Sequence, residues 1–111
     1  NIMMGMGMLA FAESLKFGES MGLEKEMLLN TIPNLPVSAP FTKMKAELIR
    51  TDQYEPQFPI ELLYKDLHLA GITGYEQEQP LPFTQAAKEL FGLALRDGLG
   101  REDMASIYKV F

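Results

Sequence analysis

Apolar residues recur at three- and four-residue spacing along most of the chain, which is the spacing of one face of an α-helix. Proline and glycine clusters interrupt this pattern, and no segment alternates strictly between polar and apolar positions. The sequence therefore predicts an all-α fold of about six helices, the first of them long, in a single domain over residues 1–111. The expected helices are residues 1–21, 23–32, 42–49, 58 to about 74, 83–95, and a last one that starts near 102.

The helix that starts near Phe58 carries two apolar stripes. One stripe is wholly apolar and predicts a core-facing surface: Ile60, Leu63, Leu67 and Ala70. The other stripe places a charge among apolar residues: Phe58, Leu62, Lys65 and Leu69. In one interpretation Lys65 lays its stem over this stripe while its head reaches water. In the other, the stripe lines a pocket, and Lys65 and the neighbouring Asp66 point at a polar ligand.

The first predicted helix combines glycine and alanine with many methionines. Its segment Gly5-Met6-Gly7-Met8-Leu9-Ala10 matches the G-x-G-x-x-A pattern of dinucleotide-binding turns. That turn follows a buried strand and opens a βαβ unit, and no strand pattern flanks this segment. We therefore expect small residues that let other backbones approach a helix closely, and a helix that packs on more than one partner. Its apolar residues exceed what one small core should bury, which favours self-association.

Two later helices complete the predicted core. The helix over 83–95 is expected to face the core with one stripe of residues: Ala86, Leu90, Leu93 and Ala94. The last helix is expected to start at Glu102-Asp103 and to use a second apolar set: Met104, Ile107, Tyr108 and Phe111.

Composition and charge exclude several classes of function. The 111 residues are 47% hydrophobic, carry a formal net charge of −5 and include no cysteine. Without cysteine there are no disulfides, no thiolate catalysis and no cysteine-ligated zinc, which fits a cytoplasmic protein. An acidic domain without a cluster of basic residues is a poor nucleic-acid binder. No apolar run approaches the roughly 18 residues of a membrane span. We therefore expect no metal, nucleic acid or membrane partner.

The segment Phe58–Ala70, F-P-I-E-L-L-Y-K-D-L-H-L-A, resembles the Phe-x-x-x-x-x-x-Lys-Asp-Leu-x-Leu-Ala segment of the β-hydroxyacid dehydrogenases. This family includes 3-hydroxyisobutyrate dehydrogenase and the glyoxylate/succinic semialdehyde reductases, and the segment leans toward the latter. Further pieces resemble the family in the same order: Ala12-Glu13 with Gly22-Leu23, Ser38 to Lys45, Pro80-Leu81-Pro82 and Asp97 to Asp103. The opening is similar to the segment that follows the family's catalytic lysine in a Lys-x-x-x-Asn motif, with Asn1 as the asparagine.

The resemblance implies a C-terminal domain like that of 6-phosphogluconate dehydrogenase, cut from a two-domain enzyme that uses NAD or NADP. In that enzyme Asn1, Phe58 and Asp66 would bind a small hydroxyacid substrate, and Lys65 would contact the cofactor. The catalytic lysine would lie upstream of Asn1, as would a Rossmann domain that is absent from these residues. The resemblance also implies a homo-oligomer. This chain alone should then bind no cofactor and be inactive.

A second hypothesis treats the chain as a non-catalytic helical interaction module. In this hypothesis the methionine-rich first helix is a dimerisation surface. The sequence upstream of Asn1 distinguishes the two hypotheses, because only the enzyme requires a lysine four residues back and a preceding dinucleotide-binding unit.

Overall fold

Helices make up nearly all of the regular structure in the computed structural model, which describes residues 1–111. The five α-helices are α1 (Ile2–Ser20), α2 (Lys25–Thr31), α3 (Thr42–Thr51), α4 (Ile60–Glu76) and α5 (Pro82–Arg96). Two short 3-10 helices follow α2 and α5, namely η1 (Ile32–Asn34) and η2 (Met104–Lys109). The predicted all-α fold with a long first helix is confirmed. None of the helices is both long and apolar enough to span a bilayer.

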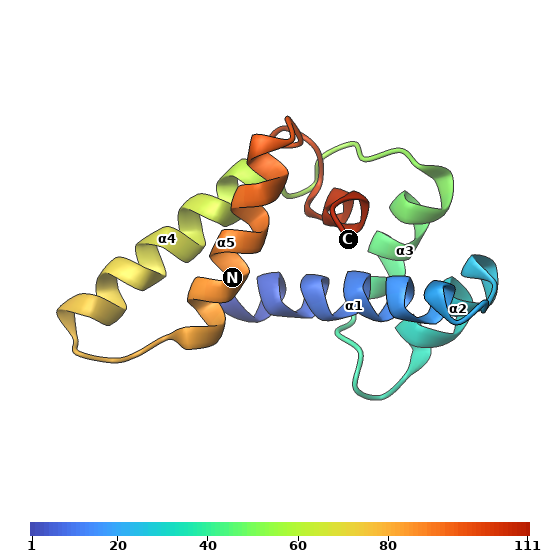
Figure 1. Cartoon of the computed structure of the whole chain (residues 1–111), viewed down its shortest axis with the longest axis horizontal. Coiled ribbons are helices and arrows are strands. Elements are labelled where there is room, and N and C mark those ends of the chain that lie inside the picture. The colour runs from blue at the N-terminus through green and yellow to red at the C-terminus, as the bar shows by residue number, and fades with distance from the viewer.

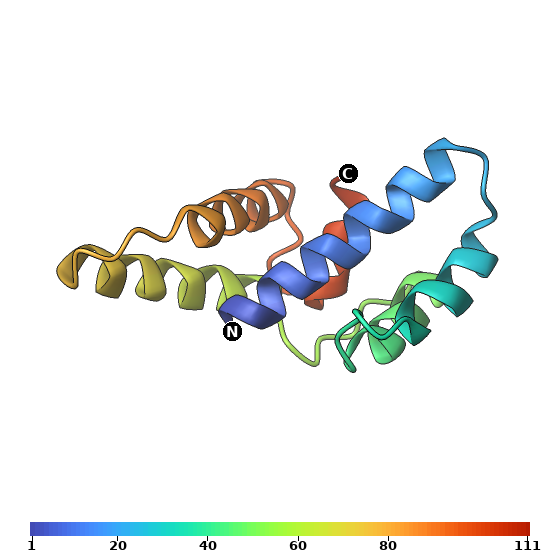
Figure 2. The ribbon, with the colours of Figure 1, turned by 90° about the horizontal axis from the view of Figure 1, so that it is seen from below.

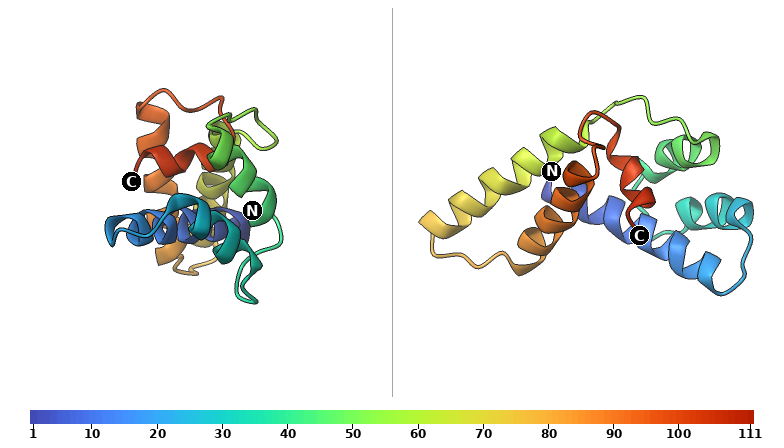
Figure 3. Two further views of the ribbon diagram at one scale, coloured as in Figure 1. Left: turned by 90° about the vertical axis from the view of Figure 1, so that its right-hand side faces the viewer. Right: turned by 45° about the horizontal axis from the view of Figure 1, so that its top comes forward.

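Helix α1 is the central element of the domain. The α4–α5 hairpin contacts its N-terminal half, α2 and α3 lie along its C-terminal half, and η2 packs between them (Figures 1 and 3). Viewed from below, α1 crosses between the hairpin and the α2–α3 pair (Figure 2). The expectation that this helix packs on several partners is therefore confirmed.

The small residues of α1 serve helix packing, as the sequence predicted. A Cβ atom at Gly5 would lie 3.5–3.6 Å from Leu63, Leu67 and Phe91, so α4 and α5 both approach this position closely. Gly5 and Gly7 are inside a continuous helix, where they cannot form a phosphate-binding turn. The dinucleotide pattern of this segment is a coincidence of composition.

The apolar surface of α1 is smaller than its sequence indicated. Four of its large apolar side chains are buried inside the domain: Met8, Leu9, Phe11 and Leu15. The most exposed are Met3 and Phe17, which are 82% and 66% accessible. The core therefore buries part of the apolar surface that suggested a dimerisation face, but of the four methionines of α1 only Met8 is fully buried.

The buried stripe of α5 differs from the predicted one. Its buried residues are Thr84, Ala87, Phe91 and Ala94, whereas Ala86 is exposed and Leu93 is 37% accessible. Of the four predicted core positions, only Ala94 is buried, and Leu90 is half-buried against the core. The prediction was wrong because Phe91, which is fully buried near Gly5 of α1, belongs to the core-facing stripe, so the buried face is offset by about one position from the predicted one. The predicted stripe left out both Phe91 and the small Thr84.

The last element is a 3-10 helix and not the predicted α-helix. Asp103 caps it, because its side chain accepts a hydrogen bond from the backbone N–H of Ala105 at 2.9 Å. Residues 104–108 are all buried, so η2 is a core element despite its length, while Phe111 is exposed.

Helix α4 begins at Ile60, two residues later than expected. Pro59 is its N-cap, with φ −65° and ψ 146°, rather than a first-turn residue. This extended conformation lets Pro59 form an isolated antiparallel bridge with Asp103. The contact with the end of the chain therefore sets where α4 starts.

Candidate functional site

Three of the four predicted site residues meet where the start of α1 lies against α4. The Asn1 amide donates from Nδ2 to Oδ2 of Asp66 at 2.5 Å, although 65 positions separate the two residues. The Lys65 ammonium lies 3.1 Å from the other carboxylate oxygen of Asp66. Asn1 precedes α1, and Lys65 and Asp66 are in the second turn of α4.

The electrostatics of this cluster orient Asn1. The hydrogen bond from Lys65, followed by that from Asn1, lowers the pKa of Asp66 and keeps it ionised near neutral pH, although desolvation opposes the shift. An ionised carboxylate only accepts hydrogen bonds, so the Asn1 amide must turn its nitrogen toward Asp66. The Asn1 Oδ1 atom then has no partner within the domain and can accept from another molecule.

Lys65 is the exposed cation of the cluster. Its side chain is 57% accessible, and only Asp66 pairs with it. An ammonium has three donors, so two remain for a ligand. Leu62 and Leu69, its neighbours on the second stripe, are also exposed, at 41% and 51%. This face of α4 is therefore a surface of the domain. Both interpretations of Lys65 fit this position.

Phe58 does not join this cluster. It precedes α4, and its half-buried side chain packs against the hydrophobic core. Its backbone N–H donates to Oδ2 of Asp103 at 3.1 Å. Asp66 lies about two helical turns further along the chain. The structure thus brings Asn1, Lys65 and Asp66 together and places Phe58 apart from them, at the base of α4.

A buried ion pair holds the base of α4 and was not predicted. Lys45 Nζ lies 2.9 Å from Oδ2 of Asp103, and the two residues are 4% and 0% accessible. The same oxygen accepts from the backbone N–H groups of Gln57 and Phe58. Lys45 shares the buried face of α3 with Thr42, Ala46 and Ile49. A lysine that is buried on such a face needs a partner of opposite charge, but the sequence pattern alone does not tell it from an exposed lysine such as Lys65.

Comparison with known proteins decides the family. The family model described as "NAD-binding of NADP-dependent 3-hydroxyisobutyrate dehydrogenase" matches residues 1–111. The chain belongs to this family. The 2-(hydroxymethyl)glutarate dehydrogenase of Eubacterium barkeri is 34% identical over 112 residues, which cover 100% of this chain and 37% of that protein. Glyoxylate/succinic semialdehyde reductase 1 of Arabidopsis thaliana is 33% identical over 107 residues, covering 96% of this chain and 37% of that protein.

A solved structure confirms the fold of this 3-hydroxyisobutyrate dehydrogenase family domain. The crystal structure of 3-hydroxyisobutyrate dehydrogenase from Salmonella typhimurium matches with a TM-score of 0.91 at 22% identity. The match covers 99% of this chain and 39% of that one. The chain thus spans little more than a third of the length of each of these three proteins.

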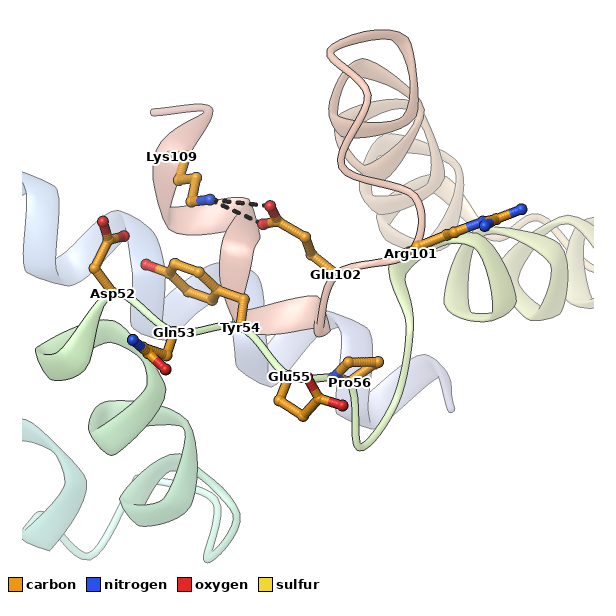
Figure 4. Close-up of a pocket in the computed structure, with 8 residues that line it drawn as sticks. All are labelled: Asp52, Gln53, Tyr54, Glu55, Pro56, Arg101, Glu102 and Lys109. Atoms are coloured by element: carbon orange, nitrogen blue, oxygen red, sulfur yellow. Dashed lines mark hydrogen bonds and ion pairs between the residues drawn. The ribbon is translucent and has the colours of Figure 1, made fainter.

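A polar surface cavity of this family domain lies elsewhere. It has a volume of about 370 Å³ and lies where the loop after α3 meets η2 (Figure 4). Burial, with the nearby carboxylates of Asp52 and Glu102, raises the pKa of Tyr54 to about 12, so its hydroxyl stays protonated at neutral pH. Lys109 lies over the Tyr54 ring at 4.4 Å and pairs with Glu102 at 2.9 Å. Lys109 and Glu102 of this cavity are thus engaged with each other, and no member of the Asn1 cluster lines it.

Proposed function

We propose that this chain is the helical C-terminal domain of an NAD(P)-dependent β-hydroxyacid dehydrogenase. The complete enzyme would oxidise a small hydroxyacid or reduce the matching semialdehyde. The observation that carries the proposal is the hydrogen bond between Asn1 and Asp66. Asn1 matches the asparagine of the family's Lys-x-x-x-Asn motif, and this bond places it against the Lys65–Asp66 pair of α4. Family membership and the oxidoreductase names of the two relatives described above support the same reaction class.

Each residue of the cluster has a chemical task in this proposal. Asp66 fixes the Asn1 amide, and the free Oδ1 of Asn1 accepts a hydrogen bond from the hydroxyl of the substrate. Lys65 fits a polar group of the cofactor because it is exposed and has two free donors. Phe58 walls the substrate pocket. When bound, the nicotinamide supplies the centre that accepts or returns hydride. The proton donor is a lysine upstream of Asn1.

We further propose that a Rossmann domain completes the site. The 111 residues hold no strand followed by a glycine-rich turn, which is the feature that binds a pyrophosphate. This chain alone should therefore show no dehydrogenase activity and should bind NAD or NADP no tighter than roughly millimolar. Calorimetry on the 111-residue chain measures this affinity. Micromolar binding would show that the helical domain holds a dinucleotide site of its own.

The test of the function uses the full-length protein that carries this segment. It should turn over at least one member of a panel of small β-hydroxyacids and semialdehydes with NAD or NADP. Asn1→Ala should lower kcat/KM, with a loss of transition-state stabilisation of about 1–3 kcal/mol, the value of a hydrogen bond to a reacting group. Asn30→Ala is the matched control, because Asn30 is also an exposed asparagine that bonds a carboxylate, that of Glu26 at 3.4 Å. No turnover across the panel, or equal effects of the two substitutions, would contradict the proposal.

A further inference from the structure

The carboxylate of Asp103 gathers four donors from three separate parts of the chain. Its Oδ2 accepts from Lys45 Nζ on α3 at 2.9 Å, from the Gln57 N–H at 2.9 Å and from the Phe58 N–H at 3.1 Å. Its Oδ1 accepts from the Ala105 N–H at 2.9 Å and caps η2. Three donors thus meet at Oδ2, while Oδ1 accepts only from the Ala105 N–H.

These bonds define where the base of α4 lies. Around Asp103, the Met104 N–H donates to the Phe58 carbonyl at 2.9 Å, and the Ile60 N–H donates to the Glu102 carbonyl at 3.0 Å. The residues just before α4 are thus bonded to η2, and Lys45 joins both to α3. Because α4 is a continuous helix, the direction in which it leaves this junction sets where its second turn, with Lys65 and Asp66, meets Asn1.

Stability alone does not account for a buried ion pair here. Two charges taken out of water lose hydration, and apolar residues of similar volume are often as stabilising as the pair that they replace. What apolar residues cannot do is bind two backbone N–H groups and one side chain at a single point. What the ion pair specifically provides is therefore a fixed position for the segment that carries Phe58.

We propose that Lys45 and Asp103 are positioning residues for the substrate site. They hold Phe58 and the start of α4, and through α4 the Lys65–Asp66 pair, without contact to any ligand. This inference rests on the proposed function, in which Phe58 walls the pocket. It adds two residues, on α3 and before η2, to a site otherwise formed by α1 and α4.

Two variants separate positioning from stability. In Asp103→Asn the amide oxygen can occupy the Oδ2 place and still accept from Lys45, Gln57 and Phe58, whereas the amide nitrogen faces the Ala105 N–H and the cap is lost. Lys45→Met with Asp103→Ala loses the same cap and also the anchor, but leaves no unpaired buried charge. The two variants therefore share the loss of the cap. They differ in the anchor, and in the Lys45 ammonium, which only Asp103→Asn leaves buried without a counter-charge; since that cost falls on the variant that keeps the anchor, loss of stability cannot explain a higher KM in the double variant.

Steady-state kinetics on the full-length protein give the first readout. The double variant should lower kcat/KM by about tenfold or more, mainly through KM, because a displaced Phe58 wall and Asn1 amide would bind the substrate less well in the ground state and the transition state alike. Asp103→Asn should keep a KM close to that of the wild type. Partial unfolding cannot imitate this result, since it lowers the amount of active enzyme, and so kcat, but not KM.

Nuclear magnetic resonance on the 111-residue chain gives the second readout. The ring signals of Phe58 and the side-chain amide signal of Asn1 should move in the double variant and stay near their wild-type positions in Asp103→Asn. The methyl signals of Leu28 and Leu29, buried on α2, report that the remaining fold is intact.

The outcomes distinguish this inference from the proposed function. A double variant with wild-type KM and unmoved Phe58 and Asn1 signals overturns the positioning role. The same KM increase in both variants also overturns it, because the cap would then be responsible. If the wild-type protein turns over no hydroxyacid, the proposed function fails, and the Phe58 and Asn1 signals alone decide whether Lys45 and Asp103 place this segment.

Discussion

Asp66 is the residue that joins the parts of the candidate site. It is partly exposed and pairs with an exposed lysine, and ion pairs of this kind contribute little to stability. What Asp66 does provide is direction, since its charge decides which end of the Asn1 amide faces outward. A substitution of Asp66 should therefore disturb ligand binding far more than folding.

Lys65→Met separates the two interpretations of this lysine. We expect the free energy of unfolding of the 111-residue chain to change by less than about 1 kcal/mol, because the ion pair with Asp66 is exposed. In the full-length protein the same substitution should weaken nucleotide binding by about 1–3 kcal/mol, the value of a charge-assisted hydrogen bond. Calorimetry with NAD and NADP measures it. Lys43→Met, at an exposed lysine of α3, is the control, and unchanged affinity in Lys65→Met would leave Lys65 as a surface lysine.

Asp66→Asn should show a dependence on pH. Because folding lowers the pKa of Asp66, the carboxylate stabilises the folded chain at pH values above its ordinary pKa of about 3.9, and this contribution is lost as the pH falls through and below that value. The wild type should therefore be slightly more stable than Asp66→Asn at pH 7, and the difference should shrink toward pH 3. Urea denaturation of both chains at the two pH values measures this. A difference that is as large at pH 3 as at pH 7 would show that Asp66 stabilises the chain by something other than its charge.

The glycines of α1 show how helix packing depends on individual positions. At Gly5 an added Cβ would make ordinary contacts at 3.5–3.6 Å, whereas at Gly18 it would lie 2.8 Å from both methyl groups of Leu28. Leu28 is itself buried, so it has little room to yield. The first position therefore tolerates a side chain, and the second sets how closely α1 and α2 cross.

Alanine at the two positions should have opposite effects. Gly5→Ala should stabilise the chain by up to about 1 kcal/mol through helix propensity. Gly18→Ala should instead destabilise it, because overpacking typically costs about 1–3 kcal/mol and outweighs the same gain in propensity. Thermal unfolding followed by circular dichroism gives both values. A gain in stability at Gly18 would mean that Leu28 moves away without loss.

Removing only one partner of the ion pair between Lys45 of α3 and Asp103 before η2 should strongly destabilise the chain. Lys45→Met leaves the Asp103 carboxylate buried without a counter-charge and should cost about 3–5 kcal/mol. Lys109→Met removes the nearby pair with Glu102, whose side chains are 36% and 35% accessible, and should cost at most about 1 kcal/mol. Urea denaturation of the two variants compares them directly. Equal small losses would mean that water reaches Asp103 when Lys45 is absent.

The helices could be predicted from local periodicity, and so could the buried face of α4, where Ile60, Leu63 and Leu67 are inaccessible, but the helix ends and the buried face of α5 could not. The position of Pro59 fits a first turn or an N-cap equally well, and only its bridge to Asp103, far along the chain, selects the N-cap. On α5, the packing of Phe91 against other elements fixed the buried face. In the site, a resemblance to a known family linked Asn1 with Asp66, since no local pattern relates residues 65 positions apart.

At the scale of the whole molecule, two lobes lie along α1, and each leaves apolar residues exposed. On the α4–α5 lobe these include Leu62, Leu69 and Ile72, between 41% and 51% accessible. At the other end, an apolar patch surrounds the turn from α1 to α2 and consists of Phe17, Met21, Leu23 and Met27, between 41% and 66% accessible. Exposed apolar groups of this kind usually mark interfaces.

We expect self-association through α1, and the exposed residues place the contact at the α1–α2 patch. Phe17 is the largest exposed side chain of that patch, so Phe17→Glu should shift the 111-residue chain to a monomer at micromolar concentration. Leu69→Glu, on the other lobe, should leave the oligomer intact. Light scattering on the three chains measures their masses. Dissociation by Leu69→Glu instead would move the interface to α4, the face that carries Lys65. A monomeric wild type would contradict self-association, and the exposed face of α4 would then remain available to the Rossmann domain proposed above.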